Sequence, residues 1–162
     1  MYLGFLTGCM GDIPLMEKAR WAANNGLKAI EISCWPRVND RDYSATDIDV
    51  DSLTENAASD IRSRVNDLGL SITSLAYYDN NLSADAAKRS FINEHLYKVI
   101  DASQLLGVCL VGTFIGRNHE ISLEENFDEF EKVFSKIVMY AEDRGIKIMI
   151  ENCPMTGWQV PG

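Results

Sequence analysis

Short runs of apolar residues recur along the chain at a nearly constant spacing, and each run follows a glycine. The glycines are Gly26, Gly69, Gly107 and Gly145, which lie 43, 38 and 38 residues apart. A glycine just beyond a helix adopts the left-handed conformation that closes it, and an unbroken apolar run is typical of a strand buried in a parallel sheet. We therefore expect strands over residues 27–32, 70–73, 108–111 and 146–151.

The segments between these runs carry apolar residues at the spacing of amphipathic helices. The clearest pattern extends from Leu123 to Ala141, and weaker ones cover residues 14–23, 53–68 and 92–106. Ser122 followed by Glu125 predicts a capping box, and Pro14 is expected as the first residue of the first helix. With an opening strand at Tyr2–Leu6, the pattern predicts four strand–helix units of about 40 residues and a fifth strand.

Two α/β architectures have this order of elements. One is an open five-stranded doubly wound sheet, which suits a chain of 162 residues. The other is a (β/α)8 barrel present only as a fragment through its fifth strand, since a complete barrel needs about 250 residues. The loop after the first strand disfavours the open sheet, because Thr7 is its only hydroxyl residue where a phosphate-binding loop would carry several.

The faces of the predicted strands also favour the barrel. In the last strand, Lys147 and Glu151 lie on one face and isoleucines on the other. Aligning the repeats by their glycines places on the polar face Ser71, Thr73, Cys109, Val111 and Thr113. Such a mixed face suits a barrel lumen. Glu31 departs from this alignment, but its apolar neighbours Ile30 and Ile32 place it in the lumen, because an unpaired carboxylate buried against helices is costly.

The charge and the cysteines exclude some classes of function. The net charge of −9 argues against a nucleic-acid-binding protein with a broad basic face. The four cysteines form no C-x-x-C pair, and free thiols are typical of a reducing compartment. The first residues do not resemble a signal peptide, and the longest apolar run, 105–116, is too short to span a bilayer. We expect a single domain over residues 1–162 in the cytoplasm, with neither nucleic acid nor a membrane as partner.

Five motifs at the predicted strand ends resemble those of one known family. They are LGFLT at 3–7, IEISCWP at 30–36, LAYYDNNL at 75–82, VGTFIGR at 111–117 and IMIENCP at 148–154. In this order they are similar to the xylose isomerase-like superfamily of sugar phosphate isomerases and epimerases, with inosose dehydratases and endonuclease IV as relatives. The resemblance covers the chain and implies the first five strands of a TIM barrel with one divalent metal at its carboxyl face.

The resemblance also implies roles for particular residues. Glu151, at the end of the fifth strand, matches the family's first metal ligand and one of its two acid/base glutamates; the alternative is a solvated carboxylate. The metal (Mn, Mg, Co or Zn) takes its other ligands from the sixth to eighth strands, which are expected beyond Gly162. The expected substrate-binding residues, each with a structural alternative, are Trp35, Tyr78, Asn81, Thr113, Arg117 and Asn152. Gly112 and Gly116 would let the backbone before Arg117 approach a ligand closely.

Other residues with reactive side chains are expected to be structural. Glu31 is expected to bond across the barrel rather than to act on a substrate. Cys34 and Cys153 are expected to be structural thiols, because neither has a base beside it in the sequence. His95 and His119 are expected at the surface, because neither lies at the end of a predicted strand.

The resemblance implies an isomerase or epimerase for a small sugar or polyol, phosphorylated or not, in which two glutamates move a proton beside a metal-polarised carbonyl. An inosose dehydratase-like lyase and a non-catalytic partial-barrel subunit are the alternatives. A nuclease like endonuclease IV is disfavoured, because its zinc-binding histidines are replaced by Tyr77 and Tyr78 and by Val111–Thr113. With one glutamate, the 162-residue chain is expected to be inactive alone. Its open sheet edges predict self-association or a missing C-terminal half.

Overall fold

Strands and helices alternate along the whole of the described chain. The computed structural model describes residues 2–37 and 46–152. Its strands are β1 (Gly4–Leu6), β2 (Ala29–Ser33), β3 (Ser71–Ala76), β4 (Leu110–Thr113) and β5 (Lys147–Ile150). Its helices are α1 (Leu15–Asn24), α2 (Glu55–Asp67), α3 (Ala86–Leu106) and α4 (Leu123–Glu142), and a 3-10 turn, Thr7–Met10, follows β1. The predicted order of four strand–helix units and a fifth strand is confirmed.

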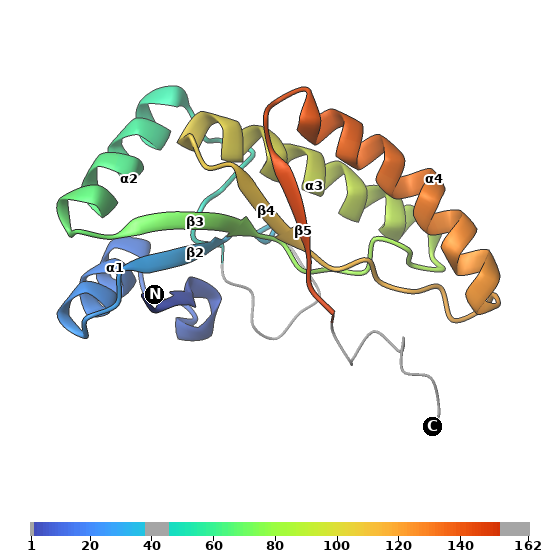
Figure 1. Ribbon diagram of the computed structural model, residues 1–162, viewed down its shortest axis with the longest axis horizontal. Helices are drawn as coiled ribbons and strands as arrows, with labels where there is room; N and C mark the ends of the chain where they lie inside the picture. Colours follow the sequence, from blue (N-terminus) through green and yellow to red (C-terminus); the bar gives the residue numbers. More distant parts are fainter. Residues whose placement is uncertain (1, 38–45, 153–162) are drawn as a thin grey trace.

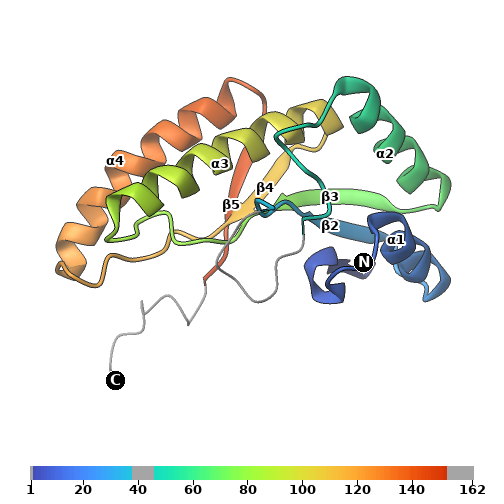
Figure 2. The ribbon, with the colours of Figure 1, turned by 180° about the vertical axis from the view of Figure 1, so that it is seen from behind.

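The five strands form one parallel sheet in the order of the sequence, β1-β2-β3-β4-β5. Because parallel crossovers are right-handed, strands that always step to the same neighbour carry their helices on one face. Figure 1 shows α2, α3 and α4 along one side of the sheet, and the view from behind in Figure 2 agrees. A doubly wound sheet would reverse its strand order, so that alternative is wrong. The fold is a partial TIM-type barrel whose sheet is not closed.

The signals at the helix ends behave as the sequence predicts, except at the start of the first helix. The four repeat glycines have positive φ angles, 80° at Gly26, 70° at Gly69, 66° at Gly107 and 70° at Gly145. The capping box of α4 is present: Ser122 Oγ accepts from the backbone N–H of Glu125, and Glu125 Oε2 accepts from that of Ser122. Pro14 precedes the first helix as its N-cap rather than opening it.

The hydrophobic core lies between the sheet and its helices. The strands contribute fully buried side chains from the helix-facing positions, among them Ile30, Ile32, Leu75 and Val111. Helix α3 packs against them with Ile92, Leu96, Val99, Ile100 and Leu106, each at most 1% exposed. The opposite face of the sheet carries none of the four α-helices, so its side chains line the open half of a barrel lumen.

The predicted lumen face of β4 is wrong by one residue. Val111 pairs with Ile148 and belongs to the core, whereas Gly112 pairs with Met149 on the open face. Cys109 and Thr113 share the face of Val111 by alternation. The cause is that β4 and β5 pair Leu110 with Lys147, so β4 starts one position later after its glycine than β5 does. Glu31 does face the lumen, and a shift of register in β3 places Ser74 opposite it.

Candidate active site

The predicted site residues gather at one edge of the sheet because the carboxyl ends of parallel strands meet there. Trp35 follows β2, Tyr78 and Asn81 follow β3, Thr113 ends β4 with Arg117 in the loop beyond, and Glu151 and Asn152 follow β5. Four of these side chains are buried: Trp35, Tyr78, Asn81 and Thr113. Glu151 and Asn152 are exposed. The site therefore has a packed wall on β2 to β4 and an accessible carboxylate on β5.

A hydrogen-bond network crosses the open face of the sheet below this edge. Glu31 Oε1 accepts from the hydroxyl of Tyr78 at 2.8 Å and from that of Ser74 at 3.1 Å. The network fits over Gly112, because a Cβ there would overlap the Tyr78 phenol oxygen and lie 3.0 Å from Glu31 Oε1. Glu31 thus bonds across the barrel as expected. Sequence reasoning missed Ser74, whose position opposite Glu31 depends on the register shift in β3.

Tyr78 is influenced by two carboxylates at once. Burial raises the pKa of its phenol most strongly, followed by the charge and hydrogen bond of Glu31 and then those of Glu151. The backbone N–H of Glu151 donates to the carbonyl oxygen of Thr113 at 3.1 Å, which extends the pairing of β4 with β5 by one residue. This bond fixes the backbone position from which the Glu151 side chain extends. A phenol has one proton to donate, and here Glu31 accepts it. The oxygen lone pairs of Tyr78 remain available to a donor from the side of Glu151.

Aromatic rings line the wall beside this network. The ring of Tyr78 lies 6.1 Å from that of Trp35 and 4.9 Å from that of Phe114, centroid to centroid. Trp35 also meets Tyr77 edge-on at 6.0 Å. These rings come from the loops after β2, β3 and β4, so their packing holds the three loops together.

Asn81 and Thr113 lie behind the surface of the site. Both are 0% exposed, and Asn81 Nδ2 donates to Thr113 Oγ1 at 3.1 Å and to the carbonyl of Phe114 at 2.7 Å. The amide oxygen of Asn81 accepts no hydrogen bond from any described residue. A substrate would reach neither side chain without movement of the loop. In this position Asn81 and Thr113 hold the backbone of Phe114 and do not contact a substrate directly.

The glycines before Arg117 serve packing within the chain. The side chain of Asn80 clamps the backbone of Arg117, accepting from its N–H and donating to its carbonyl, both at 2.9 Å. Gly116 has a φ of 81°, and a Cβ there would overlap Asn80. The close approach that the glycines allow is therefore to Tyr78 and Asn80. Within the described chain, Asn152 takes part in none of the contacts that join the other site residues.

His95 is buried, which corrects the expectation that it lies at the surface. It is 4% exposed, its Nε2 lies 2.7 Å from the carbonyl oxygen of Cys34, and its ring meets that of Tyr77 at 4.6 Å. Burial is the main cause of its lowered pKa. The sequence carries a signal for this burial, because His95 lies three residues after Ile92 and four before Val99, on the apolar stripe of α3. His119 is exposed as expected.

Of the two cysteines expected to be structural, Cys34 lies within the described residues. Cys34 is fully buried, and burial raises the pKa of its thiol far above the ordinary value. A thiol in this state is a poor nucleophile. Cys153 lies outside the described residues.

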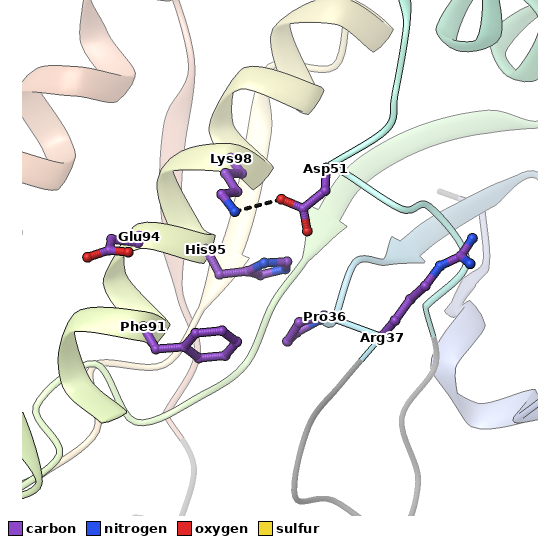
Figure 3. A pocket seen from close by; sticks show the side chains of 7 residues that line it. All are labelled: Pro36, Arg37, Asp51, Phe91, Glu94, His95 and Lys98. Atoms are coloured by element: carbon purple, nitrogen blue, oxygen red, sulfur yellow. Dashed lines mark hydrogen bonds and ion pairs between the residues drawn. The ribbon is translucent and has the colours of Figure 1, made fainter. Parts of the chain in front are cut away.

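A separate cavity lies between α3 and the loop after β2 (Figure 3). Its volume is about 260 Å³, and Pro36 and Phe91 form its apolar part beside the ring of His95. The charged side chains at its rim already have partners: Lys98 Nζ lies 2.6 Å from Asp51 Oδ1, and Arg37 Nε lies 3.1 Å from Asp49 Oδ2. It is distinct from the strand-end site and contains none of the predicted site residues.

The described residues do not by themselves form a metal centre. They contain no group of three His, Cys, Asp or Glu side chains arranged to hold one ion. Glu151 offers one accessible carboxylate, whereas Oε1 of Glu31 is occupied by Ser74 and Tyr78.

None of the helices in the described part of the chain is long and apolar enough to cross a membrane.

An ordered parallel sheet with its helices on one face and its polar residues at the carboxyl ends defines part of an α/β barrel of the TIM type. The family described as xylose isomerase-like TIM barrel matches residues 19–162, and the chain belongs to this family. The predicted resemblance is confirmed. No curated protein sequence matches the chain.

Solved structures show the same fold at low sequence identity. A xylose isomerase domain protein from Planctomyces limnophilus has a TM-score of 0.67 and 13% identity, over 93% of this chain and 54% of that one. D-psicose 3-epimerase from Clostridium cellulolyticum has a TM-score of 0.67 and 13% identity, over 91% of this chain and 51% of that one. The probable 3-DHS dehydratase AsbF from Bacillus anthracis has a TM-score of 0.63 and 18% identity, over 93% of this chain and 52% of that one. The chain spans about half the length of these structures.

Proposed function

We propose that this chain carries part of the active site of a sugar or sugar phosphate isomerase or epimerase, which transfers a proton at a carbon beside a carbonyl. The observation that carries the proposal is that the Tyr78 phenol, at the carboxyl edge of the sheet, donates to Glu31 and also interacts with Glu151. Membership of the xylose isomerase-like family and the likeness to epimerases support it. The substrate is a small sugar or polyol.

Glu151 is the catalytic acid/base in this proposal. Its carboxylate is exposed at the end of β5, where it can take a proton from a substrate carbon. In its protonated form it can donate to the phenol oxygen of Tyr78, whose own proton is held by Glu31. Trp35 and Tyr78 form a wall for the substrate, Asn152 offers an amide to a hydroxyl, and Arg117 suits a phosphate group. Asn81 and Thr113 support this wall from behind.

The site is incomplete in the described residues. Epimerisation removes a proton on one face of a carbon and returns one on the other, and Glu151 supplies one of these transfers. The family's divalent metal, whose identity is not assigned, would use Glu151 as one ligand, and its other ligands would come from outside the described residues. The 162-residue chain alone is therefore inactive as an epimerase in this proposal, although Glu151 can still exchange a proton on one face of the carbon. A cytoplasmic location stays a prediction that rests on the cysteine pattern.

The test uses D-psicose incubated with the purified chain and Mn²⁺ in deuterium oxide. Mass spectrometry of the recovered ketose measures deuterium uptake, and chromatography measures D-fructose, its 3-epimer. We expect slow uptake that is lost in Glu151→Gln and kept in Glu142→Gln, a matched change on the exposed surface of α4. Equal uptake in wild type and Glu151→Gln contradicts the role of Glu151. Formation of D-fructose at ordinary enzyme rates, about 1–10³ per second, contradicts inactivity of the chain alone.

A dehydratase is the second candidate, because one of the similar structures is the probable 3-DHS dehydratase. Removal of the same proton followed by loss of a neighbouring hydroxyl as water would give an unsaturated ketone. An absorbance increase from such a product with an inosose, dependent on Glu151 and without epimer from D-psicose, favours the lyase. If neither substrate exchanges deuterium, the non-catalytic subunit is the better account.

A further inference from the structure

The cavity between α3 and the loop after β2 has no part in the proposed function. Phe91 and His95 lie four residues apart, so they project from the same face of α3. Figure 3 shows both rings pointing toward Pro36, which follows β2. The carboxylate of Glu94 and the guanidinium of Arg37 point away from these rings. The centre of the cavity is therefore bordered by three rings that come from two different segments of the chain.

His95 offers this cavity one hydrogen-bond acceptor. Its Nε2 lies 2.7 Å from the carbonyl oxygen of Cys34, and a carbonyl can only accept, so Nε2 carries the hydrogen of the neutral ring. Burial lowers the pKa of His95, which favours this neutral form. The other ring nitrogen, Nδ1, is then an acceptor that bonds to no residue of the described chain and is not sealed from solvent. A side chain that is only 4% exposed thus presents a lone pair at the cavity that it lines.

The charges around the cavity cancel in pairs. Lys98 Nζ lies 2.6 Å from Asp51 Oδ1 along one side of it, as Figure 3 shows, and Arg37 is paired with Asp49 at the rim. A charged ligand that entered between the rings would lose its water without meeting an unpaired opposite charge, which is costly. The lining therefore favours an uncharged ligand.

We propose that this cavity binds a small uncharged aromatic compound of the phenol class, which donates its hydroxyl hydrogen to Nδ1 of His95 and packs its ring between Phe91 and Pro36. The hydroxyl matches the single acceptor, and a flat apolar ring matches the rings that border the cavity. The volume of about 260 Å³ lies below the roughly 300–1,000 Å³ of pockets for drug-sized ligands, so the ligand is limited to about one ring. This proposal does not rest on the proposed function.

A ligand in this cavity influences the strand-end site through His95. The ring of His95 meets that of Tyr77 at 4.6 Å, and Tyr77 meets Trp35 edge-on at 6.0 Å. A donor to Nδ1 polarises the imidazole, so the bond from Nε2 to the carbonyl of Cys34 becomes stronger. Cys34 directly precedes Trp35, so the bound ligand holds the wall of the site more firmly in place.

An NMR titration with phenol tests the proposal. His119→Gln leaves His95 as the only histidine of the chain, so the ring nitrogens of His95 can be followed without overlap. We expect a saturable shift of the Nδ1 resonance, with a dissociation constant on the order of 1 mM, and no shift of the Glu151 amide in the strand-end site. Toluene has a methyl group in place of the hydroxyl. It is expected to bind about fivefold more weakly, because Nδ1 then has no donor.

Two phenylalanine variants distinguish the cavity from general apolar binding. Phe91→Ala removes one ring that borders the cavity, and we expect the affinity for phenol to fall about tenfold. Phe127→Ala is the matched control, because Phe127 is 57% exposed on α4 and does not line the cavity. Its affinity for phenol should be that of the wild type. Circular dichroism checks that both variants are folded.

Four results would each overturn the proposal. They are the absence of a saturable Nδ1 shift, equal binding of phenol and toluene, equal losses in Phe91→Ala and Phe127→Ala, and tighter binding of benzoate than of phenol. The last result would show that the cavity selects a negative charge and not an uncharged ring.

Discussion

The phenol oxygen of Tyr78 lies 2.8 Å from Oε1 of Glu31, so the loop after β3 is bonded to the lumen face of β2. Ser74 donates to the same oxygen, and Gly112 leaves the space in which the phenol sits. Three neighbouring strands thus meet at one carboxylate oxygen. Glu31 is partly buried, and a carboxylate in such a place must be hydrogen-bonded. The relationship gives two predictions about stability.

Tyr78→Phe removes one of the two donors to Glu31 while keeping the ring contacts with Trp35 and Phe114. A hydrogen bond to a charged group contributes about 1.5–3 kcal/mol, so we expect a loss of free energy of unfolding near the lower end of that range, measured by urea titration. Tyr97→Phe is the matched control, because that tyrosine is partly buried and packs edge-on against Tyr140. Equal losses in the two variants would contradict the contribution of the Glu31 bond.

Gly112→Ala tests the space beneath the phenol. The new Cβ would overlap the Tyr78 oxygen and lie 2.9 Å from the ring carbon that bears it. Overpacking of this kind destabilises by about 1–3 kcal/mol, which urea unfolding measures. In the Tyr78→Phe background the oxygen is gone but the ring carbon remains, so the same substitution is expected to cost less. If the cost is unchanged in that background, the phenol is not what occupies the space.

The local parts of this fold could be predicted from the sequence because their signals are local. A glycine with positive φ closes a helix by itself, as at Gly26 and Gly145, and Ser122 with Glu125 forms a capping box within four residues. The period of these signals predicted the order of the strand–helix units, and the loop after the first strand, the strand faces and the family resemblance favoured the barrel over the doubly wound sheet. The motifs at the strand ends placed the predicted site residues at one edge of the sheet for the same reason, since each follows its strand directly.

The cross-strand parts could not be predicted, because they depend on how strands pair. A shift of one residue in β4 places Gly112 rather than Thr113 on the lumen face, and a shift in β3 brings Ser74 to Glu31. His95 shows a different failure. It was expected at the surface because it does not lie at the end of a predicted strand, although its apolar neighbours on α3 are a signal of burial. Only the structure shows the Cys34 carbonyl that lies within hydrogen-bond distance of its ring.

Lys18 and Asp47 form an ion pair that ties α1 to the segment before α2. Lys18 Nζ lies 2.8 Å from Oδ1 of Asp47, and the two side chains are 0% and 5% exposed. Lys18→Met leaves the carboxylate buried without its partner, which costs about 3–5 kcal/mol. Thermal and urea unfolding measure the loss. Adding Asp47→Asn removes the stranded charge and is expected to restore part of the stability.

The exposed pair Arg64–Asp60 serves as the control for this prediction. Its side chains are 51% and 61% exposed, and exposed pairs contribute about 0–1 kcal/mol. Arg64→Met should therefore change the unfolding free energy far less than Lys18→Met does. Similar losses in both variants, or no recovery in the Lys18→Met/Asp47→Asn double variant, would show that burial does not govern the strength of the Lys18 pair.

His95 predicts a dependence of stability on pH. Burial lowers its pKa in the folded chain, with smaller opposing effects from the Cys34 hydrogen bond and the charges of Asp51 and Asp49, and a smaller lowering effect from Lys98. The unfolded chain therefore binds a proton more readily as the pH falls through the ordinary histidine value of about 6.5. The free energy of unfolding should be highest above that value and should decrease between about pH 7.5 and pH 5.5.

Urea titrations across this range test the assignment to His95. In His95→Gln the side-chain amide can still donate to the Cys34 carbonyl but does not titrate, so we expect a flatter profile. His119→Gln is the matched control, because His119 is exposed and is the chain's only other histidine. Its profile should keep the wild-type slope. The carboxyls with lowered pKa values, Asp51, Glu125 and Glu129, titrate below this range, so a slope that survives in His95→Gln would place the pH sensitivity outside His95.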